Sequence, residues 1–315
     1  MHTDKEKAYI AVILSNTVWS YSAVSGKFLL QSLTPLQIIL VRFAIGVVVL
    51  SLFSFKEKIP FHVKEEFYYA LTGFFGIFLY VWLNHVALIY TTATNVGVLS
   101  AITPIITGLF GYIFLKEKQL DRFFWIGSVI AMIGVMLIYL SGMEFKVNII
   151  GDTIVLVNGI IWSVYAVLLG KINQFGYSVM AINRKVNMYG FLFIAIAYIV
   201  TNDSREWSGL FDKGIIPNLL ILGIGASALC FAGWSYSVKI LGAGRTSIFS
   251  YFGVILIVFL SSIFLGDRLD GKMMVAICLI LLGTIFSEQG KNIVSYINKN
   301  NVELYKGGKQ NEQEN

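Results

Sequence analysis

Charged residues are scarce in this sequence of 315 residues: only 13% are Asp, Glu, Lys or Arg, whereas 57% are hydrophobic. Soluble domains carry nearer a quarter of charged residues, so this scarcity excludes an ordinary soluble protein. The hydrophobic residues arrive in runs of roughly 20, which is the helix length that crosses about 30 Å of hydrocarbon. The runs therefore predict transmembrane helices rather than a buried core.

Cysteine is nearly absent, and the two that are present, Cys230 and Cys278, both lie inside apolar runs. This excludes a disulfide framework and a cysteine-based zinc site. The sequence also lacks His-Glu-x-x-His and Gly-x-x-x-x-Gly-Lys-Ser/Thr patterns, which argues against a metalloprotease and against ATP hydrolysis. We expect no metal and no cofactor.

Acidic residues are missing from the middle of every apolar run. A carboxylate proton relay and a paired-acid membrane enzyme are therefore not indicated, and facilitated diffusion or exchange is favoured. The net charge of +6 does not point to nucleic acid, because the basic residues are spread over short links between the runs. We expect a protein that is not an enzyme.

Ten apolar runs are separated by charged or turn-rich links. Each run is long enough to be one membrane span. The predicted spans lie near residues 8–30, 36–55, 67–88, 94–115, 122–140, 151–171, 181–200, 217–238, 246–265 and 272–288.

The basic residues fix an expected orientation. Most of the 24 lysines and arginines fall in links and tails on the side of the amino terminus, including Lys56, Lys116 and Arg184. Positively charged links favour the cytoplasm, so both termini are predicted to be cytoplasmic in a cell membrane, plasma or inner. The polar segment 290–315 is predicted to be a disordered cytoplasmic tail.

Residue patterns of the first half recur in order in the second half. Around the first and sixth spans Trp19 and Lys27 align with Trp162 and Lys171, and later matches include Ala93 with Ala243, Ser100 with Ser250 and Phe114-Leu115 with Phe264-Leu265. Five spans per half is an odd number, so the second half must be inverted in the membrane. The predicted fold is all-α and polytopic, with inverted five-helix repeats over 1–145 and 146–289.

Several motifs together resemble those of a known family. Trp19 with Gly26-Lys27, Thr34-Pro35 with Arg42, and Thr103-Pro104 followed by Phe114-Leu115-Lys116-Glu117 are similar to patterns of EamA-type members of the drug/metabolite transporter superfamily. The second copy departs from the pattern at Gly253-Val254 and at Asp267, which replaces the usual Glu. The resemblance implies a central cavity surrounded by helices one to four and six to nine, and transport of a metabolite or drug.

Polar and aromatic side chains near the middle of the spans are the candidate cargo contacts. Helical spacing places Ser15, Trp19 and Ser22 on one face, and Asn158, Trp162 and Tyr165 on another. Polar faces in lipid need protein or a wet cavity, whereas the alternative for the rings is simple core packing. Tyr80 and Pro104 complete the midplane set, Pro104 because it removes a backbone donor and predicts a kink.

Arg42 is the most costly residue inside a predicted span. It needs a partner, which is either anionic cargo or the carbonyl groups of neighbouring helices. Lys27, towards the same end of the bundle, could join it or extend to the lipid headgroups, and His85 and Asn84 are weaker candidates.

The function favoured by these patterns is secondary transport or facilitation of a small organic metabolite, an amino-acid-like solute or amphipathic drug, by alternating access. The family resemblance favours export as the direction, and import, nucleotide-sugar exchange and efflux of toxic compounds stay open. The expected partners are that solute and the lipid bilayer, without nucleic acid, and a homodimer stays open. The alternatives are a polytopic enzyme acting on a lipid-linked substrate, and a membrane receptor or scaffold without transport.

Overall fold

The computed structural model of the chain describes residues 2–91, 93–142, 148–201, 206–256 and 271–313, and within these ranges the regular structure is entirely helical. The first half contains α1 (His2–Leu29), α2 (Pro35–Ser54), α3 (Val63–Thr72), η1 (Gly73–Leu79), α4 (Tyr80–Tyr90), α5 (Ala93–Ser100), α6 (Thr103–Phe114) and α7 (Arg122–Gly142). The second half contains α8 (Ile149–Ile172), η2 (Asn173–Phe175), α9 (Val179–Thr201), η3 (Trp207–Phe211), α10 (Ile215–Ile221), η4 (Leu222–Leu229), α11 (Cys230–Leu241), α12 (Ala243–Ile248) and α14 (Gly271–Gln313).

The protein is a multi-pass membrane protein. Seven helical stretches within the described ranges are both long and apolar enough to cross a bilayer, and Arg122–Ile138 is a shorter apolar one. The seven are Pro35–Ser54, Val63–Tyr90, Asn95–Phe114, Ile149–Phe175, Val179–Thr201, Ile215–Leu241 and Gly271–Ser295. The predicted first span falls on α1, and the predicted ninth, 246–265, lies partly outside the described residues. The all-helical polytopic fold is confirmed, and the count of ten stays a prediction.

The outer faces of the helices are apolar and exposed. On α2, Leu52 is 69% exposed and Phe53 66%, and on α9 Ile199 and Val200 are exposed to 74% and 76%. Large contiguous apolar surfaces are unfavourable in water, whereas acyl chains are as apolar as the side chains themselves. These faces are therefore the lipid-facing surface of the bundle.

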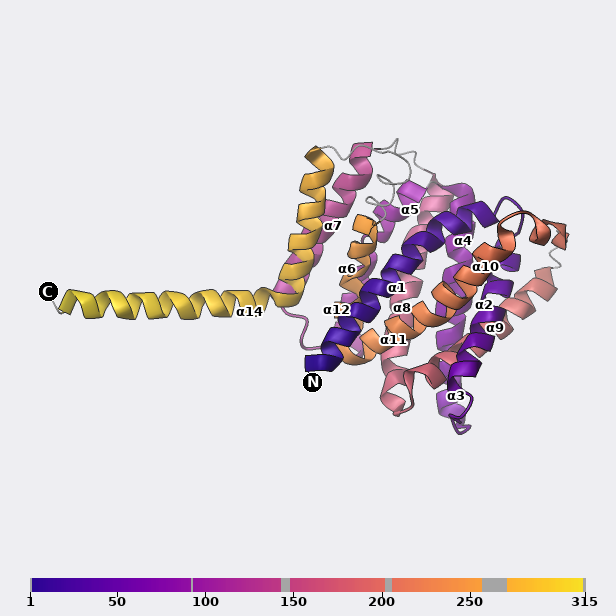
Figure 1. Cartoon of the computed structure of the whole chain (residues 1–315), viewed down its shortest axis with the longest axis horizontal. Helices are drawn as coiled ribbons and strands as arrows, with labels where there is room; N and C mark the ends of the chain where they lie inside the picture. The colour runs from indigo at the N-terminus through magenta and orange to yellow at the C-terminus, as the bar shows by residue number, and fades with distance from the viewer. Residues whose placement is uncertain (1, 92, 143–147, 202–205, 257–270, 314–315) are drawn as a thin grey trace.

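Helices α7 and α14 lie side by side at one edge of the bundle (Figure 1). Glycines make this close approach possible: a Cβ on Gly127 would lie 2.4 Å from the carbonyl oxygen of Gly283, and one on Gly283 would lie 2.5 Å from the amide nitrogen of Ala131. Small residues of this kind allow backbones to touch in membranes, where packing drives helix association. The pair packs on the rest of the bundle through an apolar cluster that includes Phe124, Ile248 and Ile277.

The other helices interleave the two halves of the chain. Helix α2 packs on α9 and η4, α9 packs on η1, and α1 packs on α11. The π-helical segments η1 and η4 occupy corresponding places in the predicted repeats, each in the span that is third in its half. π-helical turns interrupt the regular hydrogen bonding of an α-helix and frequently occur at functional sites.

The prediction of a disordered tail was wrong. Helix α14 continues from the apolar span through the polar segment as far as Gln313 and extends away from the bundle (Figure 1). No proline follows the span, and Lys, Glu and Gln are good helix formers, so a helix already nucleated by the span can propagate into them. Low hydrophobicity indicated only that this segment has no core to join.

Candidate functional site

A cavity of about 290 Å³ lies inside the bundle. Its wall is formed by residues of α1, α2, α4, α5, α6, α8 and α11 and of the helical stretch 250–254, and none of the lining residues in the described chain comes from α7 or α14. It extends to Gly26 near the end of α1, Leu88 near the end of α4 and Val96 near the start of α5. Because α1 begins at the amino terminus, the cavity lies in the half of the bundle away from that terminus.

Most of the side chains predicted as cargo contacts meet in this cavity. The lining ones are Trp19, Ser22, Arg42, Tyr80, Pro104, Asn158 and Trp162. Tyr165 is not among the lining residues: its side chain is fully buried one helical turn beyond Trp162, where its ring packs against Gly76 and Phe231. It supports the wall from behind.

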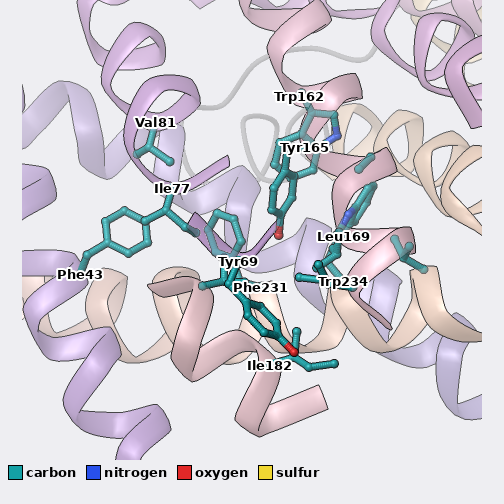
Figure 2. Close-up of a cluster of buried hydrophobic side chains, with 14 of the residues drawn as sticks. Phe43, Tyr69, Ile77, Val81, Trp162, Tyr165, Leu169, Ile182, Phe231 and Trp234 are labelled. Carbon is teal, nitrogen blue, oxygen red and sulfur yellow. The ribbon is translucent and has the colours of Figure 1, made fainter. Parts of the chain in front are cut away.

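An aromatic cluster closes the cavity on the side nearer the amino terminus. We call Trp19, Trp162, Phe231 and Trp234 the ring floor; Trp19 meets Trp162 at 5.7 Å between centroids and 87° between planes, and Phe231 at 5.3 Å. Trp234 lies 5.2 Å from Trp162. Figure 2 shows Trp162 and Tyr165 on one helix with Trp234 beside them. These edge-to-face and tilted geometries are the favourable ones for rings, so the floor is a packed structure.

The Trp19 indole is held in place by a π-helical segment. Its Nε1 donates a hydrogen bond of 3.0 Å to the carbonyl oxygen of Ala226, which lies inside η4. The altered hydrogen bonding of a π-helix can release such a carbonyl from its usual partner within the helix. One half of the chain thereby supplies the ring and the other half its anchor.

The kink expected at Pro104 is present as a break between α5 and α6, with Pro104 in the first turn of α6. Tyr251 donates a 2.7 Å hydrogen bond to the Ala101 carbonyl, and Ser247 one of 3.2 Å to the Pro104 carbonyl. Backbone groups in an interrupted membrane helix must find partners within the protein. The chain is interrupted in the second half too, at Phe249 between α12 and the helical residues that follow, although proline is absent there.

The Arg42 side chain is 3% exposed and lines the cavity. Its Nε donates a 3.3 Å hydrogen bond to Ser227 Oγ, and the guanidinium lies 5.9 Å from the ring centre of Phe43. Within the described residues no carboxylate pairs with it, and its terminal nitrogens donate to no protein group. The helix-clamp interpretation required bonds to the carbonyls of neighbouring spans, and a single long bond to a hydroxyl does not supply them.

Further polar groups reach the same cavity. His85 and Asn84 of α4 and Asn16 of α1 are lining residues, and His85 Nδ1 lies 2.8 Å from the Val81 carbonyl oxygen. Asn16 adjoins Ser15, which was predicted on the cargo face but instead bonds the Cys230 carbonyl at 3.2 Å. The sequence could have indicated Asn16, because turning the predicted face of the first helix by one residue brings Asn16 into the place of Ser15. In the described part of the chain, no three His, Cys, Asp or Glu side chains are grouped to hold a metal ion.

Beyond the ring floor, Glu117 in the link after α6 joins the two halves. Its carboxylate oxygens accept hydrogen bonds from the amide nitrogens of Ala243 and Gly244 at 2.7 and 3.0 Å, at the start of α12. Lys116 has a left-handed φ of 55°, and the Glu117 amide donates back to the Gly111 carbonyl, a common way to end a helix. Burial raises the pKa of Glu117, and the two backbone bonds partly oppose that rise.

Neighbouring contacts extend this link into what we call the Glu117 latch. Gln119 Nε2 donates to the Leu241 carbonyl at 2.9 Å, and Arg245 donates to the Gln119 carbonyl at 3.3 Å. Arg245 also lies 3.7 Å from Glu288 of α14, whose carboxylate accepts a hydrogen bond from Tyr9 of α1. The latch therefore connects α1, α6, α12 and α14 at the end of the bundle where the chain begins.

At the opposite end a second carboxylate, Asp152, joins the halves through side chains. Its Oδ1 accepts from Thr91 Oγ1 at 2.7 Å and from Asn95 Nδ2 at 2.9 Å, and its Oδ2 accepts from the Asn148 amide at 3.0 Å. Asn148 in turn caps α8 through the Gly151 amide. This link lies at the rim of the wall formed by α5 and α8, beside the cavity rather than across it.

Comparison with known proteins gives one consistent result. The profile of the EamA-like transporter family matches residues 6–140 and again 149–288. An uncharacterized transporter of Clostridium kluyveri is 25% identical over 293 residues, covering 90% of this chain and 93% of its own. The uncharacterized transporter YetK of Bacillus subtilis is also 25% identical, over 88% of this chain and 85% of its own. One crystal structure, 18% identical, shares the fold with a TM-score of 0.71 over 91% of this chain and 98% of its own.

Proposed function

The chain belongs to the EamA-like transporter family, and from that premise we propose that it moves a small organic metabolite across the cell membrane by alternating access. The observation that carries the proposal is the cavity between the two halves, which the ring floor and the Glu117 latch separate from one end of the bundle. Among the described residues, a solute bound there meets this barrier on one side, which is the arrangement that alternating access requires.

The proposed moving parts are the two repeats, 1–145 and 146–289. At the latch end the Ala243 and Gly244 amides bond to Glu117, and at one edge of the bundle α7 and α14 pack closely through glycines. Rocking of one repeat against the other would break the bonds from Ala243 and Gly244 to Glu117 and part Trp19 from Trp162. The same movement would narrow the cavity from its other end.

The proposed contacts with the solute are Trp19, Ser22, Arg42, Tyr80, Pro104, Asn158 and Trp162, with Tyr165 supporting the Trp162 ring. An amino-acid-like or amphipathic solute fits a cavity that combines rings, amides and a single cation.

We propose export as the net direction, with both termini in the cytoplasm. A cysteine introduced at Asn301 tests this topology. If that cysteine reacts with a membrane-impermeant reagent in intact cells, the carboxyl terminus lies outside and the proposed orientation is wrong.

The function is tested by counterflow in proteoliposomes with pooled metabolites, with and without a pH gradient. We expect uptake of at least one solute above that of protein-free vesicles, without a requirement for the gradient. Comparison of right-side-out and inside-out vesicles then gives the direction. A purified, folded protein that moves no solute but binds a partner protein through its links would favour the scaffold alternative.

A further inference from the structure

The charge of the cavity wall is one-sided. Arg42 is the single Lys or Arg among the described residues that line it, and no Asp or Glu is among them. His85 is the one other lining group that can take a positive charge. The remaining polar lining groups are amides and hydroxyls, which are neutral. A buried site with one cation and no acid has a positive potential, and it favours a ligand of negative charge.

The Arg42 guanidinium is incompletely satisfied. It has five N–H donors in a planar fork, and the described residues accept from Nε alone, through Ser227 Oγ. At 3% exposure the charge cannot be solvated by bulk water, and an unpaired buried charge is strongly unfavourable. The terminal nitrogens are the donors that bind a carboxylate or phosphate through two parallel bonds.

Helix α8 contributes to the cavity wall a neutral polar group in need of a partner. Asn158 of α8 is 4% exposed and lines the cavity, and its side-chain oxygen is buried without a hydrogen bond. A hydroxyl or N–H group on the ligand would satisfy it. Asn84 lies on the same wall of the cavity as His85, whose Nδ1 contacts Val81.

Rings cover the part of the cavity next to these groups. The Tyr80 and Trp162 centroids are 4.6 Å apart and Trp19 completes the surface, so an apolar or planar body can lie against three rings. The volume of about 290 Å³ is at the lower limit of small-molecule sites, which selects a compact metabolite.

We infer that the cavity binds an amphipathic organic anion, whose carboxylate or phosphate is held by Arg42 and whose apolar body lies on Trp19, Tyr80 and Trp162. The inference rests on the proposed function and narrows its substrate class. A zwitterion or an amine binds less well, because the described lining residues provide no carboxylate for an ammonium group. Ring faces alone attract cations only weakly by comparison with a buried ion pair.

The test measures binding and transport on one preparation of the full-length protein. Four probes share a phenyl body: 3-phenylpropionate, phenyl phosphate, phenylalanine and phenethylamine. Quenching of tryptophan fluorescence reports binding, and uptake into proteoliposomes reports transport. We expect at least one of the two anions to bind tenfold or more tightly than the zwitterion and the amine, and the better anion identifies the head group.

Arg42→Gln should weaken binding of that anion at least tenfold. Arg184→Gln is the matched control, because Arg184 donates to the Ser54 and Glu57 carbonyls outside the cavity, and its binding should equal that of the unmodified protein. If Arg42→Gln does not fold, Ser100→Asp tests the same inference by adding a negative charge to the cavity instead of removing the positive one. A new carboxylate in the cavity wall should weaken binding of the anion and strengthen binding of phenethylamine, each at least threefold.

Equal binding of anion and amine, or an Arg42→Gln protein that folds and keeps its anion affinity, would overturn the inference. The proposed function fails separately, if none of the probes and none of the pooled metabolites is transported. Binding of an anion without transport would leave the site assignment standing and remove the transport proposal.

Discussion

The two ends of the bundle close the space between the halves in different ways. At the end where the chain begins, the ring floor fills the axis and the Glu117 latch joins α6 to backbone groups of α12. At the other end, Asp152 joins the halves at the rim and the space beside it is the cavity. A barrier and a site thus lie in series along one axis. They share Trp19, Trp162 and Phe231, whereas Glu117 of the latch does not line the cavity and can be changed without touching it.

The largest effect is expected from removing a ring of the barrier. Trp19→Ala should lower transport far more than it lowers the yield of folded protein, because Trp19 contacts Trp162 and Phe231 and anchors on Ala226. Removal of a fully buried Trp costs about 3–5 kcal/mol in stability, and Trp19 is partly buried, so the melting temperature also falls but by less than that loss would give. Uptake per folded molecule is the measurement.

Trp207→Ala is the control for that variant, since its indole bonds Tyr198 in a peripheral segment. Equal losses of uptake and yield in Trp19→Ala would mean that the ring floor is simply core.

The next largest effect is expected from disturbing Gly76 and Tyr165, which pack behind the ring floor. Gly76→Ala places a Cβ 2.0 Å from the Tyr165 ring, which is fully buried and cannot move aside. Overpacking of this kind costs about 1–3 kcal/mol or more. Gly225→Ala in the other π-helical segment meets only Val18 at 3.3 Å and should be mild. Thermal unfolding of both variants tests this, and equal losses of stability would remove the distinction between the two segments.

The latch gives a smaller effect of a different kind. Glu117→Gln leaves one oxygen to accept from Ala243 or Gly244 and turns an amide N–H₂ toward the other donor, at a cost of about 1–3 kcal/mol. We expect faster labelling of a cysteine at the ring floor from the end where the chain begins. Glu206→Gln, at an exposed site, should label as slowly as the parent. Identical rates in all three proteins would mean that the latch holds nothing closed.

The same residue gives the closed form a pH dependence. Because the pKa of Glu117 is raised above its ordinary 4.5 in the closed form, that form binds the proton more tightly than an open form with a solvated carboxylate. Closure is therefore favoured at low pH, and it weakens as the pH rises from about 4.5 through the raised value. Labelling rates measured across this window should increase with pH, and Glu117→Gln should flatten the increase. A parent profile that falls with pH would reverse the sign and reject the assignment.

The smallest effect concerns the turn that carries Glu117. Lys116 adopts a left-handed φ of 55°, which costs a side-chain-bearing residue about 1–2 kcal/mol. Lys116→Gly should raise the melting temperature by a net gain under about 1 kcal/mol, since glycine is also more costly to order. Lys118→Gly, at a position without a positive φ, should lower it. A lower melting temperature in both variants would show that the turn at Lys116 is not strained.

The all-helical polytopic fold followed from the length and composition of the runs, because hydrocarbon demands helices of a set length. Trp19 and Trp162, which counting along the spans places near their middle, line one cavity. The same reasoning could not predict how each helix is rotated about its own axis. Ser15 was placed on the cargo face, whereas Asn16 lines the cavity, since a shift of one residue turns a helix by more than a quarter of its circumference.

The latch and the π-helical segments depend on contacts between residues far apart in the chain. Glu117 was visible as part of a motif, but its partners are backbone amides of Ala243 and Gly244, which no side-chain pattern marks. Likewise, the sequence Gly73–Leu79 reads as an ordinary apolar helix. The segment packs against α9 and Tyr165, and such contacts belong to tertiary structure rather than to local propensity.

The account is tested most directly by blocking the cavity from each end. With Cys230 and Cys278 replaced by alanine, Ser100→Cys places one thiol in the cavity wall. We predict that an impermeant thiol reagent reacts when applied from the end away from the amino terminus, that the reaction abolishes uptake, and that transported solute slows it. Reaction only from the end where the chain begins, or a fully modified protein that still transports, would contradict the account.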